Sequence, residues 1–199
     1  MSGYSRCICG DFSSVDIKLS KFRVAGTCRR NEFYNIQLPY MRNFRIVPLS
    51  AAYAATIRES GRDDFGHPVM SQVAKGFGPC RVSLKAFEVG VDERLLFSHS
   101  PFEIDNAFNQ PGPIFIHKKE VAAYSDVHCF PPEIKADKAH FPLSLIGYSK
   151  DQRMVYTKLV GDADVEDLIE ETFQQYIKID YLHVRNAAAC CYICKVERL

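Results

Sequence analysis

The side chains best suited to chemistry gather near the C-terminal end of the chain, in the run Tyr181-Leu-His-Val-Arg-Asn186. A histidine can act as a general base or a ligand near neutral pH, so His183 is a candidate catalytic residue. Arg185 can bind a carboxylate or phosphate through two parallel hydrogen bonds, and Asn186 can orient a ligand or simply shape a turn. The alternative for His183 is a hydrogen-bonded histidine in a partly buried sheet.

The same run predicts a β-strand, followed by a second strand that folds back on it. Successive side chains of a strand point to opposite faces, so Leu182 and Val184 share one face and His183 points the other way. We expect the rest of the fold to pack against the aliphatic face. Arg185 and Lys195 are expected on the face of His183.

The register of this hairpin stays open. A three-residue loop pairs Val184 with Tyr192, which brings three more side chains to the aliphatic face: Tyr192, Cys194 and Val196. A two-residue loop pairs Leu182 with Ile193 instead. Asn186 is the residue best able to take a left-handed conformation in the turn.

Two further candidates come from the middle of the chain. The segment 79–86 alternates between apolar and polar residues and predicts a strand with Arg81 on the outward face, where it could bind a carboxylate or phosphate or form a structural ion pair. His99, at the end of a predicted strand over 94–99, is the second candidate catalytic residue. A metal site would require His99, His117 and His183 to converge, and separated single histidines are a weak signal, so no metal is predicted.

The cysteine spacings do not indicate a metal or redox centre. Cys191 and Cys194 have a C-x-x-C spacing, but residues three apart in a strand face opposite sides, which is poor geometry for chelation. Cys7-x-Cys9 with Cys28 lacks an evident fourth ligand. No phosphate-binding loop, serine-nucleophile elbow or zincin motif is present, so no cofactor can be named.

Composition limits the classes of partner and the compartment. The chain has 199 residues, 47% of them hydrophobic, and a formal net charge of +1, which permits a sizeable core and argues against a nucleic acid or an anionic membrane as the main partner. No stretch approaches the roughly 20 apolar residues of a membrane-spanning helix. Without an evident secretory signal, the eight cysteines are expected to be reduced thiols in the cytoplasm.

The pattern of elements predicts an α+β fold. Short strands are expected at 44–47, 94–99, 114–117, 143–148, 153–160 and in the terminal hairpin, with helices at 51–59 and 165–177 capped by Ser50 and Asp164. Short connections favour a mainly antiparallel sheet with a few packed helices, although a crossover from 153–160 through the helix to 180–186 would allow a mixed sheet.

Residues 1–40 differ from the rest of the chain, because they show no helical stripe of useful length and only one short alternating stretch. We predict that they form a poorly integrated extension and that residues 41–199 form a single α+β domain. An alternative interpretation is that the native chain starts at Met41.

Several motifs recur in the order typical of a known family. They are Gly76-Phe-Gly-Pro-Cys-Arg-Val-Ser-Leu84, Gly112-Pro-Ile-Phe-Ile116, Leu143-Ser-Leu145, Tyr181-Leu-His-Val-Arg-Asn186, Cys191-Tyr192 and Val196-Glu-Arg198. From about Met41 onward the chain resembles the bacterial domain-of-unknown-function 1203 family. It departs from the pattern at Gly78 and at Tyr156-Thr157. The resemblance implies a fold but no activity.

Two functions fit the sequence. In the first, the chain binds a small molecule or acts on one, in a pocket lined by Arg81, His99, His183, Arg185 and Asn186 beside the loop 100–112. In the second, it is a non-catalytic interaction module that uses a strand edge or an apolar helix face, for instance in a homodimer. Whether the chain is an enzyme is left open.

Overall fold

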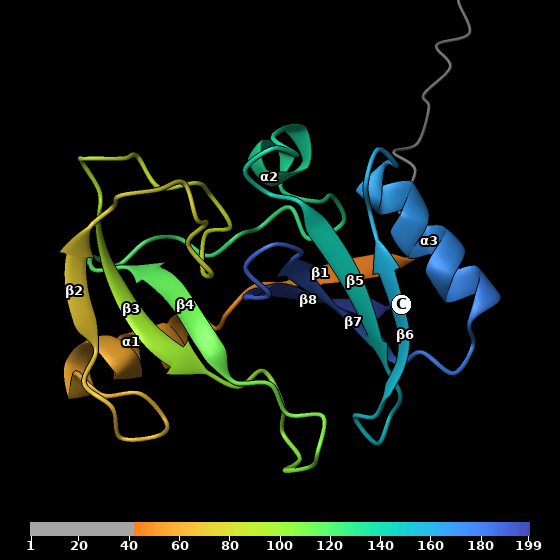
Figure 1. Ribbon diagram of the computed structural model, residues 1–199, viewed down its shortest axis with the longest axis horizontal. Helices are drawn as coiled ribbons and strands as arrows, with labels where there is room; N and C mark the ends of the chain where they lie inside the picture. The colour runs from red at the N-terminus through yellow and green to blue at the C-terminus, as the bar shows by residue number, and fades with distance from the viewer. Residues whose placement is uncertain (1–41) are drawn as a thin grey trace, which may run out of the picture. The chain divides into compact units, whose positions relative to one another are not determined.

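The computed structural model describes residues 42–199 (Figure 1). The N-terminal extension predicted for residues 1–40 therefore lies outside the described residues. The strands are β1 (Phe44–Val47), β2 (Met70–Val73), β3 (Glu93–His99), β4 (Gly112–His117), β5 (Leu143–Tyr148), β6 (Met154–Leu159), β7 (Tyr181–Asn186) and β8 (Tyr192–Arg198), and the helices are α1 (Ala51–Ser60), α2 (Pro132–Ala136) and α3 (Val165–Gln175).

The strands form two sheets, which confirms the predicted α+β class. One sheet has the order β1-β8-β7-β5-β6 and the other the order β2-β3-β4. Each strand pairing in residues 42–199 is antiparallel. A crossover through α3 does exist, but β5 lies between β6 and β7, so no parallel pair is formed and the sheet is not mixed.

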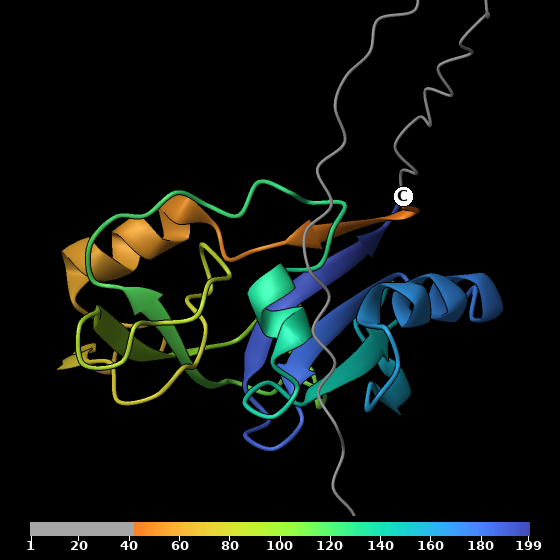
Figure 2. The ribbon, with the colours of Figure 1, turned by 90° about the horizontal axis from the view of Figure 1, so that it is seen from above.

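The helix α3 packs on the five-stranded sheet, as Figures 1 and 2 show. Asp164 caps it, because its side chain accepts hydrogen bonds from the amides of Glu166 and Asp167 at 2.9 and 3.3 Å. Its buried side chains Leu168, Ile169 and Phe173 join a core that contains Leu182 and Val184. The predicted extension of this helix to residue 177 is wrong: it ends at Gln175, and Ile177 is 88% exposed.

The three-stranded sheet packs against α1, which lies over it in Figure 2. Ser50 caps α1 and Gly61 ends it at φ +62, as the sequence predicts. The strand β2 is not among the strands that the sequence predicts. Its burial pattern is mostly exposed, so it lacks the alternation by which a strand is recognised in a sequence. None of the helices of residues 42–199 is long and apolar enough to span a membrane.

The strand predicted for residues 79–86 is wrong. Pro79 and Ala86 form an isolated bridge, and the residues between them make a turn closed by a hydrogen bond from the Leu84 amide to the Cys80 carbonyl at 2.8 Å. Leu84 has a φ of +52, which is incompatible with an extended strand. The turn enters both cores, because Leu84 lies in the core of the larger sheet and Val82 in that of the smaller one.

The terminal hairpin forms, with a register that neither predicted loop gives. Val184 pairs with Cys194 and Leu182 with Val196, and a bulge then shifts the register so that Arg185 pairs with Tyr192. Cys194 and Val196 therefore share the aliphatic face as predicted, whereas Tyr192 moves to the face of His183. The left-handed residue of the turn is Cys190, at φ +58, and not Asn186.

Candidate functional site

His183 lies on the opposite face of β7 from Leu182 and Val184, but that face is also covered. The side chain is fully buried, and four aromatic rings surround it with centroids 4.7 to 5.1 Å away: those of Phe102, Tyr148, Tyr181 and Tyr192. Neither ring nitrogen of His183 has a hydrogen-bond partner. Buried polar atoms are nearly always paired, so this histidine is an exception that calls for an explanation.

Burial lowers the pKa of His183 well below its usual value, and the positive charges of Arg185 and Lys195 act in the same direction. The imidazole is therefore neutral at pH 7. A neutral imidazole has one N–H donor and one nitrogen acceptor. Both are held among aromatic rings, where a bond to an incoming polar group would be strong.

His99 sits at the end of β3 and reaches the same cluster through Tyr192. Ring centroids of His99 and His183 lie 5.9 and 5.1 Å from that of Tyr192. On its other side, His99 Nδ1 lies 3.3 Å from the hydroxyl of Tyr53, which donates its proton to Asp64 at 2.6 Å. The hydroxyl has a single proton, so it must accept from Nδ1–H, which leaves Nε2 of His99 as the unprotonated nitrogen. Burial lowers the pKa of His99 to about 4.

Arg81 is buried, although the sequence predicts it on an outward face. Its guanidinium donates to the Tyr192 carbonyl at 2.6 Å, to the Pro79 carbonyl and to the Cys191 sulfur at 3.3 Å. The turn that replaces the predicted strand is the reason, because it directs this side chain toward β8. Burial lowers the pKa of Arg81.

Arg185 is the second buried cation of the cluster. It donates to the Cys190 carbonyl at 3.1 Å and to the Gln110 carbonyl at 3.5 Å, and its Nε has no partner. No carboxylate of residues 42–199 forms an ion pair with either Arg81 or Arg185. Burying a charge is costly unless an opposite charge accompanies it, and these two buried guanidinium groups have no carboxylate partner.

Of the five predicted site residues, the structure brings four together, and Asn186 is the exception. Its side-chain oxygen accepts from the amides of Ala188 and Ala189 at 2.9 and 2.8 Å, and its amide nitrogen donates to the His140 carbonyl at 3.3 Å. Asn186 therefore organises the hairpin turn. Shaping a turn is the alternative to ligand binding that the sequence offers for Asn186.

The loop 100–111, which the sequence places beside the predicted pocket, covers the aromatic cluster around His183. Phe102 of this loop lies edge-on against both His183 and Tyr148, at 5.0 and 5.1 Å between centroids. Gln152 holds the loop, because its side-chain oxygen accepts from the amides of Glu103 and Ile104 at 3.0 and 3.1 Å. Sequence reasoning missed Phe102, Tyr148 and Tyr53, since only the tertiary fold brings these aromatic residues to the histidines.

A polar pocket of about 300 Å³ opens beside the loop 100–111. Its lining includes Tyr181, which stacks on Tyr148 at 5.5 Å, and the two neighbours of Phe102, Pro101 and Glu103. Lys195, which faces the ring of Tyr181, also lines it. None of the five predicted residues lines this pocket. Tyr181 nevertheless links the lining of this pocket to His183, because their ring centroids lie 5.1 Å apart.

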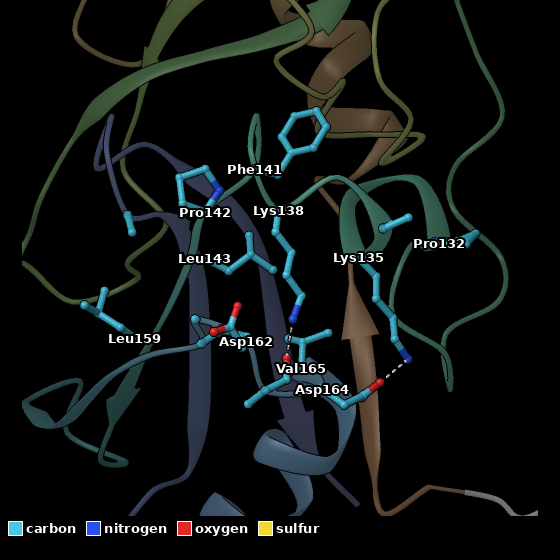
Figure 3. Close-up of a pocket in the computed structure, with 15 residues that line it drawn as sticks. Pro132, Lys135, Lys138, Phe141, Pro142, Leu143, Leu159, Asp162, Asp164 and Val165 are labelled. Carbon is cyan, nitrogen blue, oxygen red and sulfur yellow. Dashed lines mark hydrogen bonds and ion pairs between the residues drawn. The ribbon is translucent and has the colours of Figure 1, made fainter. Parts of the chain in front are cut away.

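A larger, mainly apolar pocket of about 880 Å³ lies elsewhere, between α2, the start of β5 and the start of α3 (Figure 3). Phe141, Leu143 and Val165 are among its lining residues. Its two lysines are engaged, Lys138 with the Ala163 carbonyl at 3.0 Å and Lys135 with Asp164 at 2.8 Å. None of the five predicted residues lines it either. This apolar pocket therefore shares no lining residue with the cluster of the two histidines and two arginines.

No group of three or more histidine, cysteine and acidic side chains in residues 42–199 is placed to hold a metal. Comparison with known proteins gives one finding. The family model described as "Protein of unknown function (DUF1203)" matches residues 77–198. No curated protein and no solved structure matches the chain.

Proposed function

Because the chain belongs to the DUF1203 family, which is described as being of unknown function, we propose a function from geometry: the domain binds a small organic anion, a carboxylate or a phosphate ester, in the cluster of His99, His183, Arg81 and Arg185. The observation that carries the proposal is the pair of buried guanidinium groups without a carboxylate. An anionic ligand would supply the missing charge.

The neighbouring groups suit an anion with an uncharged planar part. Neutral His183 can donate one hydrogen bond to a ligand oxygen and accept another. The rings of Tyr148, Tyr181 and Tyr192 give apolar walls, as most small-molecule sites have. The ligand would enter through the polar pocket at Tyr181 once Phe102 moves aside, in the way that surface loops commonly gate sites.

Calorimetric titration of the full chain with sodium benzoate and, separately, inorganic phosphate tests this proposal, with ionic strength held constant by sodium chloride. The two arms distinguish a carboxylate site from a phosphate site. We expect Arg185→Met to weaken binding at least tenfold, and His183→Ala to weaken it as well. The control is Arg153→Met, which removes one charge from an exposed arginine. Absence of binding in both arms, or equal binding by the two arginine variants, contradicts the proposal.

A second candidate function is self-association through β6. This strand lies at the edge of the larger sheet, pairing only with β5 among the described strands, and it exposes Val155 and Leu159. An exposed apolar edge can pair with the same edge of a second copy. Light scattering of the purified chain, compared with that of Val155→Lys, tests this: a dimer that the lysine dissociates supports it, and a monomer contradicts it.

We also propose a cytoplasmic location and no nucleic-acid partner. The free thiols of the described residues, Cys80, Cys129, Cys190, Cys191 and Cys194, support a reducing compartment. The formal net charge of +1 supports the second point, because nucleic-acid surfaces need a concentration of positive charge.

A further inference from the structure

A second group of reactive side chains lies apart from the aromatic cluster, at the far end of β4. His117 is the last residue of that strand and pairs with Arg94 of β3. Its Nε2 lies 3.4 Å from the carboxylate of Asp92. The phenyl ring of Phe87 packs against the imidazole, with 4.6 Å between centroids, and fixes its orientation.

The thiol of Cys80 also interacts with the side chain of His117. The turn 80–85 places Cys80 beside β4, because the neighbouring amide of Arg81 donates to the Phe115 carbonyl at 3.0 Å. Burial raises the pKa of the Cys80 thiol, but interaction with His117 and hydrogen bonds from the backbones of Ser83 and His117 outweigh burial and lower that pKa to about 7. Interaction with Cys80 in turn raises the pKa of His117. The order thiol, imidazole, carboxylate is that of an activated nucleophile, its base and the group that orients the base.

Two buried polar side chains accompany this thiol. The side chains of Ser83 and His117 both interact with the Cys80 sulfur and lower the pKa of the thiol, and both residues are more than nine-tenths buried. Neither Ser83 Oγ nor His117 Nδ1 makes a hydrogen bond of normal geometry to another group in the described structure. The thiol therefore has polar neighbours within an otherwise apolar core.

Burial limits the size of a reagent that can reach this thiol. Cys80 is fully buried, and it lines neither the 880 Å³ pocket nor the 300 Å³ pocket. A reagent of a few heavy atoms, close in size to water, is the kind that can reach it through local opening. Arg81 adds a positive charge facing the sulfur, and Lys119 faces Asp92.

We propose that Cys80, His117 and Asp92 form a thiol site at which hydrogen peroxide oxidises Cys80 to the sulfenic acid. The thiolate sulfur attacks one peroxide oxygen, so that an S–O bond forms as the O–O bond breaks. The sulfur is oxidised by two electrons and the peroxide is reduced. The departing hydroxide takes the proton of the His117 imidazolium and leaves as water. Sulfenic acids are reversible and react further with thiols.

The chain contains a matched internal control for this proposal. Cys194 is as fully buried as Cys80, but it lacks the histidine, and burial raises its pKa to about 12. At pH 7.5 the thiolate fractions differ by about four orders of magnitude, and the weaker intrinsic nucleophilicity of a low-pKa thiolate reduces the advantage in rate to roughly a hundredfold.

The experiment treats the full chain with hydrogen peroxide and dimedone and measures the sulfenic-acid adduct on each cysteine by peptide mass spectrometry. We expect Cys80 to be labelled about a hundredfold faster than Cys194, with half-maximal labelling near pH 7. We expect His117→Asn to slow the labelling of Cys80 at least tenfold and Asp92→Asn to slow it less. The labelling of exposed Cys129 should not change.

Equal labelling of Cys80 and Cys194, or labelling of neither, overturns the proposal. So does a rate at Cys80 that His117→Asn leaves unchanged. If a variant loses its fold, Cys194 becomes labelled and reveals it, and the comparison of the two buried thiols in the wild-type chain then decides the question.

Discussion

The phenyl ring of Phe102 stands edge-on to the imidazole of His183, with 5.0 Å between their centroids and 67° between their planes. One ring belongs to a surface loop and the other to a central strand of the larger sheet. Their contact closes the aromatic cluster on the side of the polar pocket. It also leaves both nitrogens of His183 without a hydrogen-bond partner, so the protein keeps a polar group in a place where an apolar ring would be more stable.

The first prediction concerns the stability that is lost by burying the imidazole of His183 without hydrogen-bond partners. We expect His183→Phe to raise the free energy of unfolding by about 1 kcal/mol, because the change removes an unpaired buried polar group and keeps the aromatic contacts. The same variant should lose anion binding. Urea unfolding and calorimetry measure the two effects. A variant that is less stable than the wild type would show that the imidazole has a structural partner.

The second prediction concerns the hold of Gln152 on the loop 100–111. Gln152 has a φ of +55, which glycine adopts without strain, so Gln152→Gly removes the buried side chain and its two hydrogen bonds to Glu103 and Ile104 without straining the turn. We expect hydrogen exchange at these two amides to become at least tenfold faster. Lys150→Gly, in the same turn, is the control. Unchanged exchange in the Gln152 variant would mean that other contacts hold the loop.

The third prediction is a loss of stability in mild acid. The unfolded chain takes up a proton on each histidine near pH 6.5, whereas burial delays protonation of folded His99 to about pH 4 and that of His183 to lower pH. The contribution of these two histidines is therefore fully present above about pH 7 and is lost between pH 6.5 and 4, by about 3 kcal/mol for His99 alone.

His117 does not contribute to the loss of stability between pH 6.5 and 4. Its pKa is raised in the folded protein, so its contribution is fully present below pH 6.5 and is lost only as the pH rises above that value. Urea unfolding at a series of pH values measures the slope. We expect His99→Gln to make the slope between pH 6.5 and 4 shallower, and an identical slope in that variant would contradict the assignment.

The fourth prediction tests a close approach in β5. A Cβ atom at Gly147 would lie 2.9 Å from Cδ1 of Ile179 and 3.0 Å from Cβ of Tyr156. We expect Gly147→Ala to lower the free energy of unfolding by about 1–3 kcal/mol, because a packed core resists an added methyl group. Gly112→Ala is the matched control, since nothing lies within 4 Å of the added atom there. Equal effects of the two substitutions would show that the region around Ile179 yields easily.

Local patterns predicted the elements that depend on local physics. Ser50, Gly61 and Asp164 set helix boundaries through hydrogen bonds within one turn of chain. The alternation at Leu182, His183 and Val184 correctly separated the two faces of β7. The exposed strand β2 escaped prediction because it lacks the regular alternation that marks a strand. The turn at 80–85 was predicted as a strand because its sequence does alternate.

Four of the five residues predicted for a site lie close together in the structure, and their role in binding or catalysis stays a prediction. His99, His183, Arg81 and Arg185 do converge, but the sequence places His183 and Arg81 on outer faces, and in the structure both are buried. The bulge between Val184 and Arg185 contributes to the burial of His183, because it moves Tyr192 to the histidine face. The turn at 80–85 is what buries Arg81. A bulge inserts one residue into one strand and leaves no dependable trace in the sequence.

The sequence by itself determined the α+β class, the helix caps, the alternation of β7 and the absence of a familiar catalytic motif, since each depends on neighbours in the chain. Only the tertiary structure decided which face of that strand is covered, which aromatic rings enclose His183, and that two arginines are buried without a carboxylate. Those features arise where two sheets and a long loop meet. Contacts between segments far apart in the chain are set by packing, and packing follows no period that can be found in a sequence.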